Sequence, residues 1–154
     1  MSAKIMTCLD HTQLTDWISV IKADGLLTGT SLYGPLTPES DEDYVVTCAW
    51  LKETTKVMGL KSPKKEPSKY NLMCYSYKYR PDEKDRWVNL LVVEDNKSLL
   101  AWEYASLQML LIDPIWDKSE RAKTFEKHLT KAFCFMGLKN RSPDIVKGVE
   151  WATI

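Results

Sequence analysis

The residues best suited to chemistry lie in the stretch 29–43, GTSLYGPLTPESDED, which begins with a turn of small residues and ends in an acidic segment. Asp41 and Asp43 are separated by one residue, and the segment after them is rich in β-branched and aromatic side chains, which predicts a strand. Side chains two apart on a strand point to the same face. We therefore expect Asp41 and Asp43 to project together, while Glu42 points away.

Two carboxylates on one face repel each other and attract cations. Mg²⁺ is the natural candidate, because it takes hard oxygen ligands and usually shares its coordination shell with substrate phosphates. The turn at Gly29, Thr30 and Ser31 supplies backbone N–H groups and side-chain hydroxyls, and such a turn can cradle an anion. A phosphate-binding turn that faces a metal-binding carboxylate pair predicts a nucleotide site.

The spacing of this stretch resembles the active-site motif of the nucleotidyltransferase superfamily with the polymerase-β-like fold, in its minimal form G-S-x-x-Y-G-x-x-T-P-x-S-D-x-D. One position departs from the motif: Thr30 stands where the family usually has serine, and both carry a hydroxyl. The alternative interpretation is a proline-rich turn followed by a solvated acidic strand start. The residues in register with the motif are Gly29, Tyr33, Gly34, Thr37, Pro38, Ser40, Asp41 and Asp43.

This resemblance implies a transfer reaction that depends on Mg²⁺ or Mn²⁺. A nucleoside monophosphate would pass from a triphosphate, with ATP as the expected donor, to an acceptor that is a protein, an RNA or a small molecule. In enzymes of this family two metal ions activate the acceptor hydroxyl and hold the triphosphate. Asp41 and Asp43 would be the catalytic metal ligands. The residues that would contact the nucleotide are Gly29, Thr30, Ser31, Tyr33, Gly34 and Ser40.

The family also has a third carboxylate on a later strand, and here the expected strand is 87–93. Its central polar residue is Asn89, which takes the third catalytic position without the charge. An amide offers one neutral oxygen, so it binds Mg²⁺ far less strongly than a carboxylate does. Asp85, across a turn, is the one substitute that we retain.

The incomplete carboxylate set leaves two hypotheses open. In the first, Asp41 and Asp43 hold the Mg²⁺-triphosphate and transfer proceeds with two carboxylates. In the second, the chain is a catalytically impaired nucleotidyltransferase-fold protein that acts as a binding or inhibitory module through contacts with a protein partner. Cysteine–histidine, serine-elbow, P-loop and metalloprotease patterns are absent from the sequence, so hydrolase functions are disfavoured.

Length and composition set the frame for both hypotheses. The 154 residues suit a single nucleotidyltransferase-like domain spanning 1–154, and the net charge of zero argues against a dedicated nucleic-acid coat or membrane-surface protein. The four cysteines match no zinc spacing, so we expect them to be reduced. With no signal peptide or membrane-spanning segment in the sequence, we expect a cytoplasmic protein without a membrane partner, in the host cytoplasm if a phage encodes it.

Periodicity predicts the elements that must position these groups. We expect a small mixed sheet with helices mainly on one face, and a cleft between the Gly29 turn and the strand at 87–93. The predicted helices are 10–23, 98–112 and 119–136, with a loop or short helix at 52–58. The predicted strands are 25–28, 44–50, 70–80 and 87–93, the last two as a hairpin, with an apolar tail at 145–154 that packs back on the domain.

Other features of the sequence each have a structural and a functional interpretation. The lysine-rich segment 59–69 predicts a solvated loop, or one that reaches over a bound triphosphate. The alternating tyrosines of the strand at 70–80 predict packing beneath a helix, or a ladder on which bases stack. On the last long helix, a lysine stripe predicts a solvated face, or a surface on which an acceptor docks, at Lys123, Lys127 and Lys131.

Overall fold

The structure is a computed structural model that describes residues 9–38, 40–61, 72–79, 86–139, 141 and 145–152, with side chains at all of these except 79 and 145–152. Residues 1–8, most of the lysine-rich segment at 59–69 and Asp85 lie outside the described residues. The helices are α1 (His11–Asp24), α2 (Thr30–Tyr33), α3 (Cys48–Val57), α4 (Asn96–Leu110) and α5 (Lys118–Phe135). The strands are β1 (Leu26–Thr28), β2 (Glu42–Thr47), β3 (Leu72–Tyr79), β4 (Arg86–Val93) and β5 (Ile145–Ala152).

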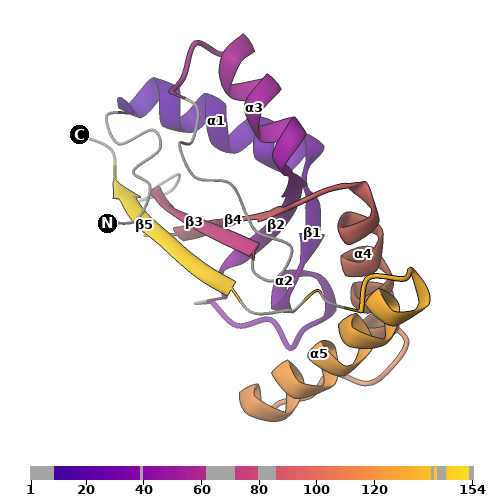
Figure 1. Ribbon diagram of the computed structural model, residues 1–154. Helices are drawn as coiled ribbons and strands as arrows, with labels where there is room; N and C mark the ends of the chain where they lie inside the picture. Colours follow the sequence, from indigo (N-terminus) through magenta and orange to yellow (C-terminus); the bar gives the residue numbers. More distant parts are fainter. Residues whose placement is uncertain are drawn as a thin grey trace.

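The strands form one mixed sheet in the order β1-β2-β4-β3-β5 (Figure 1). β2 runs parallel to β4 and β5 parallel to β3, whereas the β1–β2 and β3–β4 pairs are antiparallel. The predicted mixed sheet and the β3–β4 hairpin pairing are therefore confirmed, and the C-terminal tail packs back as an edge strand. β2 and β4 lie side by side in the middle of this order, so the acidic strand and the strand of Asn89 are neighbours.

Helices cover both faces of the sheet, so the prediction that they lie mainly on one face is wrong. α1 and α3 pack on one face and α4 and α5 on the other (Figure 1). The physical reason is visible in β2, where Tyr44 and Val46 enter the first core while Val45 enters the second. A strand that is apolar on both sides must be buried on both sides.

The first helix follows its sequence pattern closely. Asp10 caps α1, its carboxylate accepting a hydrogen bond from the N–H of Gln13 at 2.8 Å, and the Gln13 side chain accepts in return from the Asp10 N–H. This capping box satisfies N–H groups that the helix cannot pair internally. The predicted apolar face is buried, at Leu14, Trp17, Ile18 and Ile21.

The predicted strand at 44–50 ends earlier than expected, because β2 stops at Thr47. The Thr47 hydroxyl accepts a hydrogen bond from the Trp50 N–H at 3.1 Å, so it caps α3. Cys48 to Trp50, predicted as strand, form the first turn of that helix, in which Ala49 has the highest intrinsic helix propensity. The threonine cap fixes this boundary, because a side chain that accepts from an N–H group of the first turn stabilises the start of a helix.

The tyrosine ladder of β3 is a core element. Tyr75 and Tyr77 are fully buried on the face that α1 covers, and the ring of Tyr77 meets that of Trp17 edge-on with centroids 6.5 Å apart. Neither ring has a free face for a base, so the stacking alternative is wrong for these two positions. The side chain of Tyr79 lies outside the described residues.

Candidate functional site

The two aspartates converge on one amide. Asp43 lies on β2 and Asn89 on β4, and the parallel register places them side by side. The Asn89 Nδ2 donates to Asp43 Oδ1 at 2.8 Å and to Asp41 Oδ2 at 3.4 Å, although Asp41 precedes the strand. The expected common orientation of Asp41 and Asp43 is therefore present, and Asn89 occupies the neighbouring position from which a third carboxylate would reach them.

A third strand adds a residue that the sequence interpretation missed. Ser76 on β3 pairs with Asn89 across the antiparallel ladder, and its Oγ donates to Asn89 Oδ1 at 2.7 Å. This bond holds the amide with its nitrogen toward the carboxylates. Ser76 could have been found from the sequence only by fixing the register of the hairpin, because nothing in the residue type distinguishes it from other strand serines.

Gly29 brings the turn directly against Asp43. Its φ of +71° lies in the left-handed region, which L side chains rarely adopt. A Cβ on Gly29 would also lie only 2.4 Å from Asp43 Oδ2, far inside van der Waals contact. Glycine is thus required twice over, once for the turn and once for the approach of the carboxylate.

The hydroxyls between the turn and the aspartates bind the loop itself. Ser31 Oγ donates to the backbone carbonyl of Asp41 at 2.6 Å, which ties α2 to the start of β2. Ser40 Oγ accepts from the Thr37 N–H at 2.9 Å. Thr30 begins α2, and its carbonyl accepts from the Gly34 N–H at 2.9 Å. These bonds fix the loop, so the motif hydroxyls act first as its internal scaffold.

Tyr33 closes the α4–α5 side of the cluster. Its ring stacks on Phe125 of α5, with centroids 6.0 Å apart and an interplanar angle of 17°. The pKa of Tyr33 is raised to about 12, chiefly by burial and also by the charge of Asp43, while the charge of Arg121 acts in the opposite direction. The phenol therefore stays protonated at neutral pH and remains a hydrogen-bond donor beside the acidic pair.

Asp43 is the electrostatically unusual member of the pair. Its pKa is raised to about 6, chiefly by burial; the charge of Asp41 also raises it, and the hydrogen bond from Asn89 lowers it. The carboxylate is thus close to its titration midpoint in slightly acidic solution. A cation beside it would favour the charged form, because an opposite charge lowers the pKa of an acid.

The donor set fits a Mg²⁺ ion that brings its own ligands. Within the described part of the chain, no group of three or more histidine, cysteine or acidic side chains could hold a metal by itself. Asp41 is exposed and Asp43 half-buried, so the pair offers hard oxygen donors of which those of Asp41 are the more accessible. Mg²⁺ is commonly held by one or two carboxylates, with water and substrate phosphates completing its shell.

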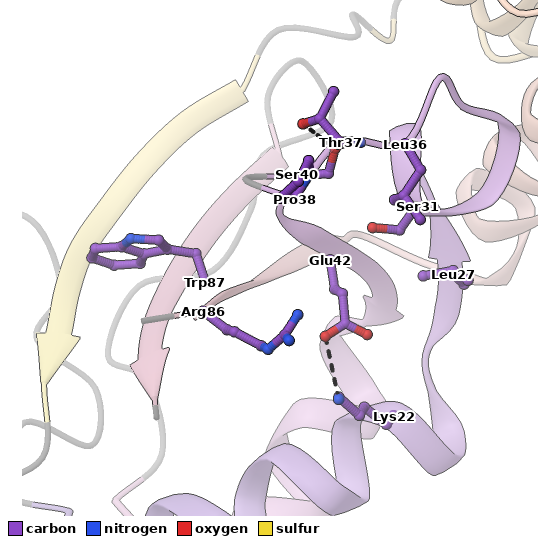
Figure 2. Close-up of a pocket in the computed structure, with 10 residues that line it drawn as sticks. All are labelled: Lys22, Leu27, Ser31, Leu36, Thr37, Pro38, Ser40, Glu42, Arg86 and Trp87. Carbon is purple, nitrogen blue, oxygen red and sulfur yellow. Dashed lines mark hydrogen bonds and ion pairs between the residues drawn. The ribbon is translucent and has the colours of Figure 1, made fainter. Parts of the chain in front are cut away.

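A cavity of about 730 Å³ lies next to the motif, on the other side of the acidic strand (Figure 2). Glu42 points into it, bound to Lys22 Nζ at 3.2 Å, and Arg86 also extends toward this carboxylate. The predicted cleft between the Gly29 turn and β4 exists in part, since Ser31 and Trp87 line this cavity. Neither Asp41 nor Asp43 is among its described lining residues, so the cavity and the acidic pair lie on opposite faces of β2.

Comparison of the chain with protein-family models, with curated proteins and with solved structures finds no match. Among the described helices, none is both long enough and apolar enough to cross a membrane.

Proposed function

We propose that this chain is a nucleotidyltransferase-like protein that binds a Mg²⁺-nucleoside triphosphate at Asp41 and Asp43 and transfers the nucleoside monophosphate to an acceptor. The observation that carries the proposal is the convergence of these two carboxylates on one point beside the Gly29 turn. A loop of small residues against an acidic pair suits a polyphosphate and its cation. Mn²⁺ is the expected substitute metal, and ATP is the first donor to test.

The chain's own groups would each have a defined part in this reaction. Bound Mg²⁺ would supply charge neutralisation at the phosphates. Asp43 must lose its proton to act as a ligand, and the Asn89 amide must release the carboxylates that it now binds. The acceptor hydroxyl would release its proton to water as its oxygen bonds to the α-phosphorus, and the bond to the β-phosphate oxygen would break, so that pyrophosphate leaves with the electron pair of that bond.

The cavity next to the motif loop offers room for a distal part of an acceptor, whose reacting oxygen would have to lie on the other face of β2, beside the acidic pair. Ser31 joins the two regions, because it lines the cavity while its hydroxyl binds the backbone of Asp41. The mixed lining of hydroxyl, cationic and apolar groups suits a protein segment, an RNA end or a small molecule. We place the reaction in a reducing cytoplasm, in accord with the free thiols of Cys48 and Cys74.

A second candidate function is supported by the amide itself. Asn89 already satisfies both carboxylates with N–H groups, so the cluster has an internal partner where the related enzymes need a cation. A protein with this arrangement can keep the scaffold without catalysis and act as a binding or inhibitory module. It would bind one protein partner stoichiometrically, and Asp41→Ala would leave its biological effect intact.

The test of the primary proposal is incorporation of radiolabel from each common ribonucleoside triphosphate, α-labelled, into cell extract with Mg²⁺ or Mn²⁺. We expect incorporation that is lost in Asp41→Ala and in Asp43→Ala. Asp16→Ala, an exposed acid on α1, is the matched control and should retain it. Absence of transfer from every triphosphate with either metal would reject the catalytic proposal, and a stoichiometric partner in a pull-down would then support the binding module.

A further inference from the structure

Helix α5 carries one cation, Arg121, on the side that faces the acidic pair. The lysine stripe of this helix forms the solvated face that the sequence predicts. Lys123, Lys127 and Lys131 are exposed, as predicted, but Arg121 is half-buried. Arg121 precedes Phe125 by four residues, and side chains at this spacing share one face of a helix. Phe125 is the residue on which Tyr33 stacks, so Arg121 belongs to the face of α5 that meets α2.

The guanidinium is held in place and still has donors to offer. Arg121 Nη1 donates to the backbone carbonyl of Ile115 at 2.9 Å, which anchors the side chain just before the start of α5. Arginine carries five N–H donors. Within the described residues Ile115 is its sole hydrogen-bond acceptor, so the rest of the fork is available to a ligand.

Tyr33 links the face of α5 that carries Arg121 to the candidate metal ligands, because its ring stacks on Phe125 of that face. The pKa of the Tyr33 phenol responds to two charges in opposite directions, raised by Asp43 and lowered by Arg121. Both groups are therefore within electrostatic reach of one hydroxyl on α2. Because Gly29 begins the turn that leads into α2 and lies against Asp43, the same small region holds the turn, the acid and the cation.

We propose that Arg121 binds the β- and γ-phosphates of the nucleoside triphosphate, and that it is the protein's own counter-charge at this site. The inference rests on the proposed function and adds a residue to it. A triphosphate with one Mg²⁺ keeps a net negative charge, and two aspartates can only repel it. Arginine suits this role because its planar fork can pair with two phosphate oxygens at once.

The experiment compares Arg121→Gln with Lys127→Gln by calorimetric titration of ATP and of AMP in Mg²⁺. Lys127 is an exposed cation on the same helix, so its substitution controls for net charge. Loss of a hydrogen bond to a charged group predicts that Arg121→Gln weakens ATP binding by about tenfold or more. AMP binding should stay within about twofold of wild type, because AMP lacks the phosphates that Arg121 is proposed to bind.

The outcomes separate this inference from the function on which it rests. If the wild type binds ATP and Arg121→Gln binds it as tightly as Lys127→Gln does, the assignment of Arg121 is wrong while the nucleotide site stands. If the wild type binds no triphosphate, the proposed function itself fails. If Arg121→Gln does not fold stably, Arg121→Lys replaces it in the test. This variant retains the charge but loses the planar fork, so its ATP affinity should lie between those of wild type and a variant without the cation. A folded Arg121→Lys that binds ATP as tightly as Lys127→Gln does would also contradict the proposal.

Discussion

Asn89 Nδ2 lies 2.8 Å from Asp43 Oδ1 on the adjacent parallel strand, so a hydrogen-bond donor stands beside a carboxylate where a metal site would place another acceptor. Ser76 holds the amide in that orientation from the next strand. The relationship explains how a close acidic pair is tolerated without a cation, because the amide hydrogens supply the missing partial positive charge. It also makes the residue at 89 the clearest point at which metal affinity can be altered.

Asn89→Asp should tighten Mg²⁺ binding by about tenfold or more, since a carboxylate binds this ion far better than a neutral amide oxygen. Without metal the same variant should be less stable than wild type, by about 1–3 kcal/mol, because it replaces a donor with a third negative charge. Calorimetric Mg²⁺ titration and thermal unfolding with and without the ion measure the two effects.

Asn96→Asp is the matched control for the change at position 89. Asn96 is an exposed residue at the start of α4, so its substitution adds the same charge away from the cluster. It should leave Mg²⁺ affinity unaltered. Equal Mg²⁺ affinities in Asn89→Asp and Asn96→Asp would show that position 89 is not the vacant third position of the site.

Asp43→Asn should stabilise the metal-free protein at neutral pH. The folded-state pKa of Asp43, about 6, is above the ordinary value for the unfolded chain, so the fold disfavours its charged form. The penalty is fully present above pH 6 and disappears as the pH falls toward 4, where the unfolded chain also becomes protonated. We expect an advantage of the order of 1–3 kcal/mol at pH 7.5 in EDTA, shrinking toward pH 4.

Urea unfolding of both proteins across this pH range tests the effect. The sign of the change in unfolding free energy is informative, because replacing a buried hydrogen-bonded group normally destabilises a protein, whereas here we expect stabilisation. A loss of stability in Asp43→Asn that is equal at pH 7.5 and pH 4.5 would indicate that Asp43 carries no electrostatic penalty in the fold.

Gly29→Ala should disrupt the acidic pair itself. The new Cβ would lie 2.4 Å from Asp43 Oδ2, and the alanine would also have to adopt a φ of +71°. Gly59 provides a matched control, because it has a φ of +68° and nothing within 4 Å of an added Cβ. Gly59→Ala thus measures the backbone cost alone, about 1–2 kcal/mol.

The stability difference between Gly29→Ala and Gly59→Ala then isolates the contact with Asp43. We expect Gly29→Ala to cost more, by about 1–3 kcal/mol, in keeping with overpacking of a fixed site. Triphosphate binding should be weakened in Gly29→Ala and unchanged in Gly59→Ala. Equal stability and equal binding in the two variants would mean that the turn does not position Asp43.

The sequence predicted the elements far better than their boundaries and layers. The apolar spacing of α1 and the alternation of β3 were sufficient, because these patterns are determined by local geometry. The strand end at Thr47 was missed, since one side-chain cap decided it. The placement of helices on both faces was missed because it depends on which helices bury each of the two apolar faces of β2, and these helices are distant in the sequence.

At the site, what the sequence could provide was the set of residues on one continuous stretch. The motif placed Asp41, Asp43 and Gly29 together, and a family pattern placed Asn89 beside them. Ser76 and Arg121 come from β3 and α5, and only the sheet register and the packing of α5 on α2 bring them near. No spacing along the chain encodes such contacts, which is why they were not predicted.

A bidentate ion pair far along the chain should contribute stability that depends on pH. Arg141 binds both carboxylate oxygens of Asp95, at 2.7 and 2.8 Å, and Asp95 also caps α4 through the Ser98 N–H at 3.0 Å. The hydrogen bond from Arg141 is the largest of the effects that lower the pKa of Asp95 to about 2. A depressed folded-state pKa means that the stabilisation is present above the unfolded value, near 4, and is lost as the pH falls toward 2.

Arg141→Gln should therefore cost about 1 kcal/mol at pH 7, a modest value because the Asp95 side chain is 43% exposed and its charge is screened by solvent. Urea unfolding at several pH values measures this, with the exposed Lys139→Gln as the control for charge. The deficit should be constant from pH 7 to 5 and should diminish between pH 4 and pH 2, as Asp95 becomes protonated. A deficit that keeps its size at pH 2.5 would assign the effect to contacts of the arginine that do not titrate with the carboxylate, namely its packing and its hydrogen bond to Ser98 Oγ.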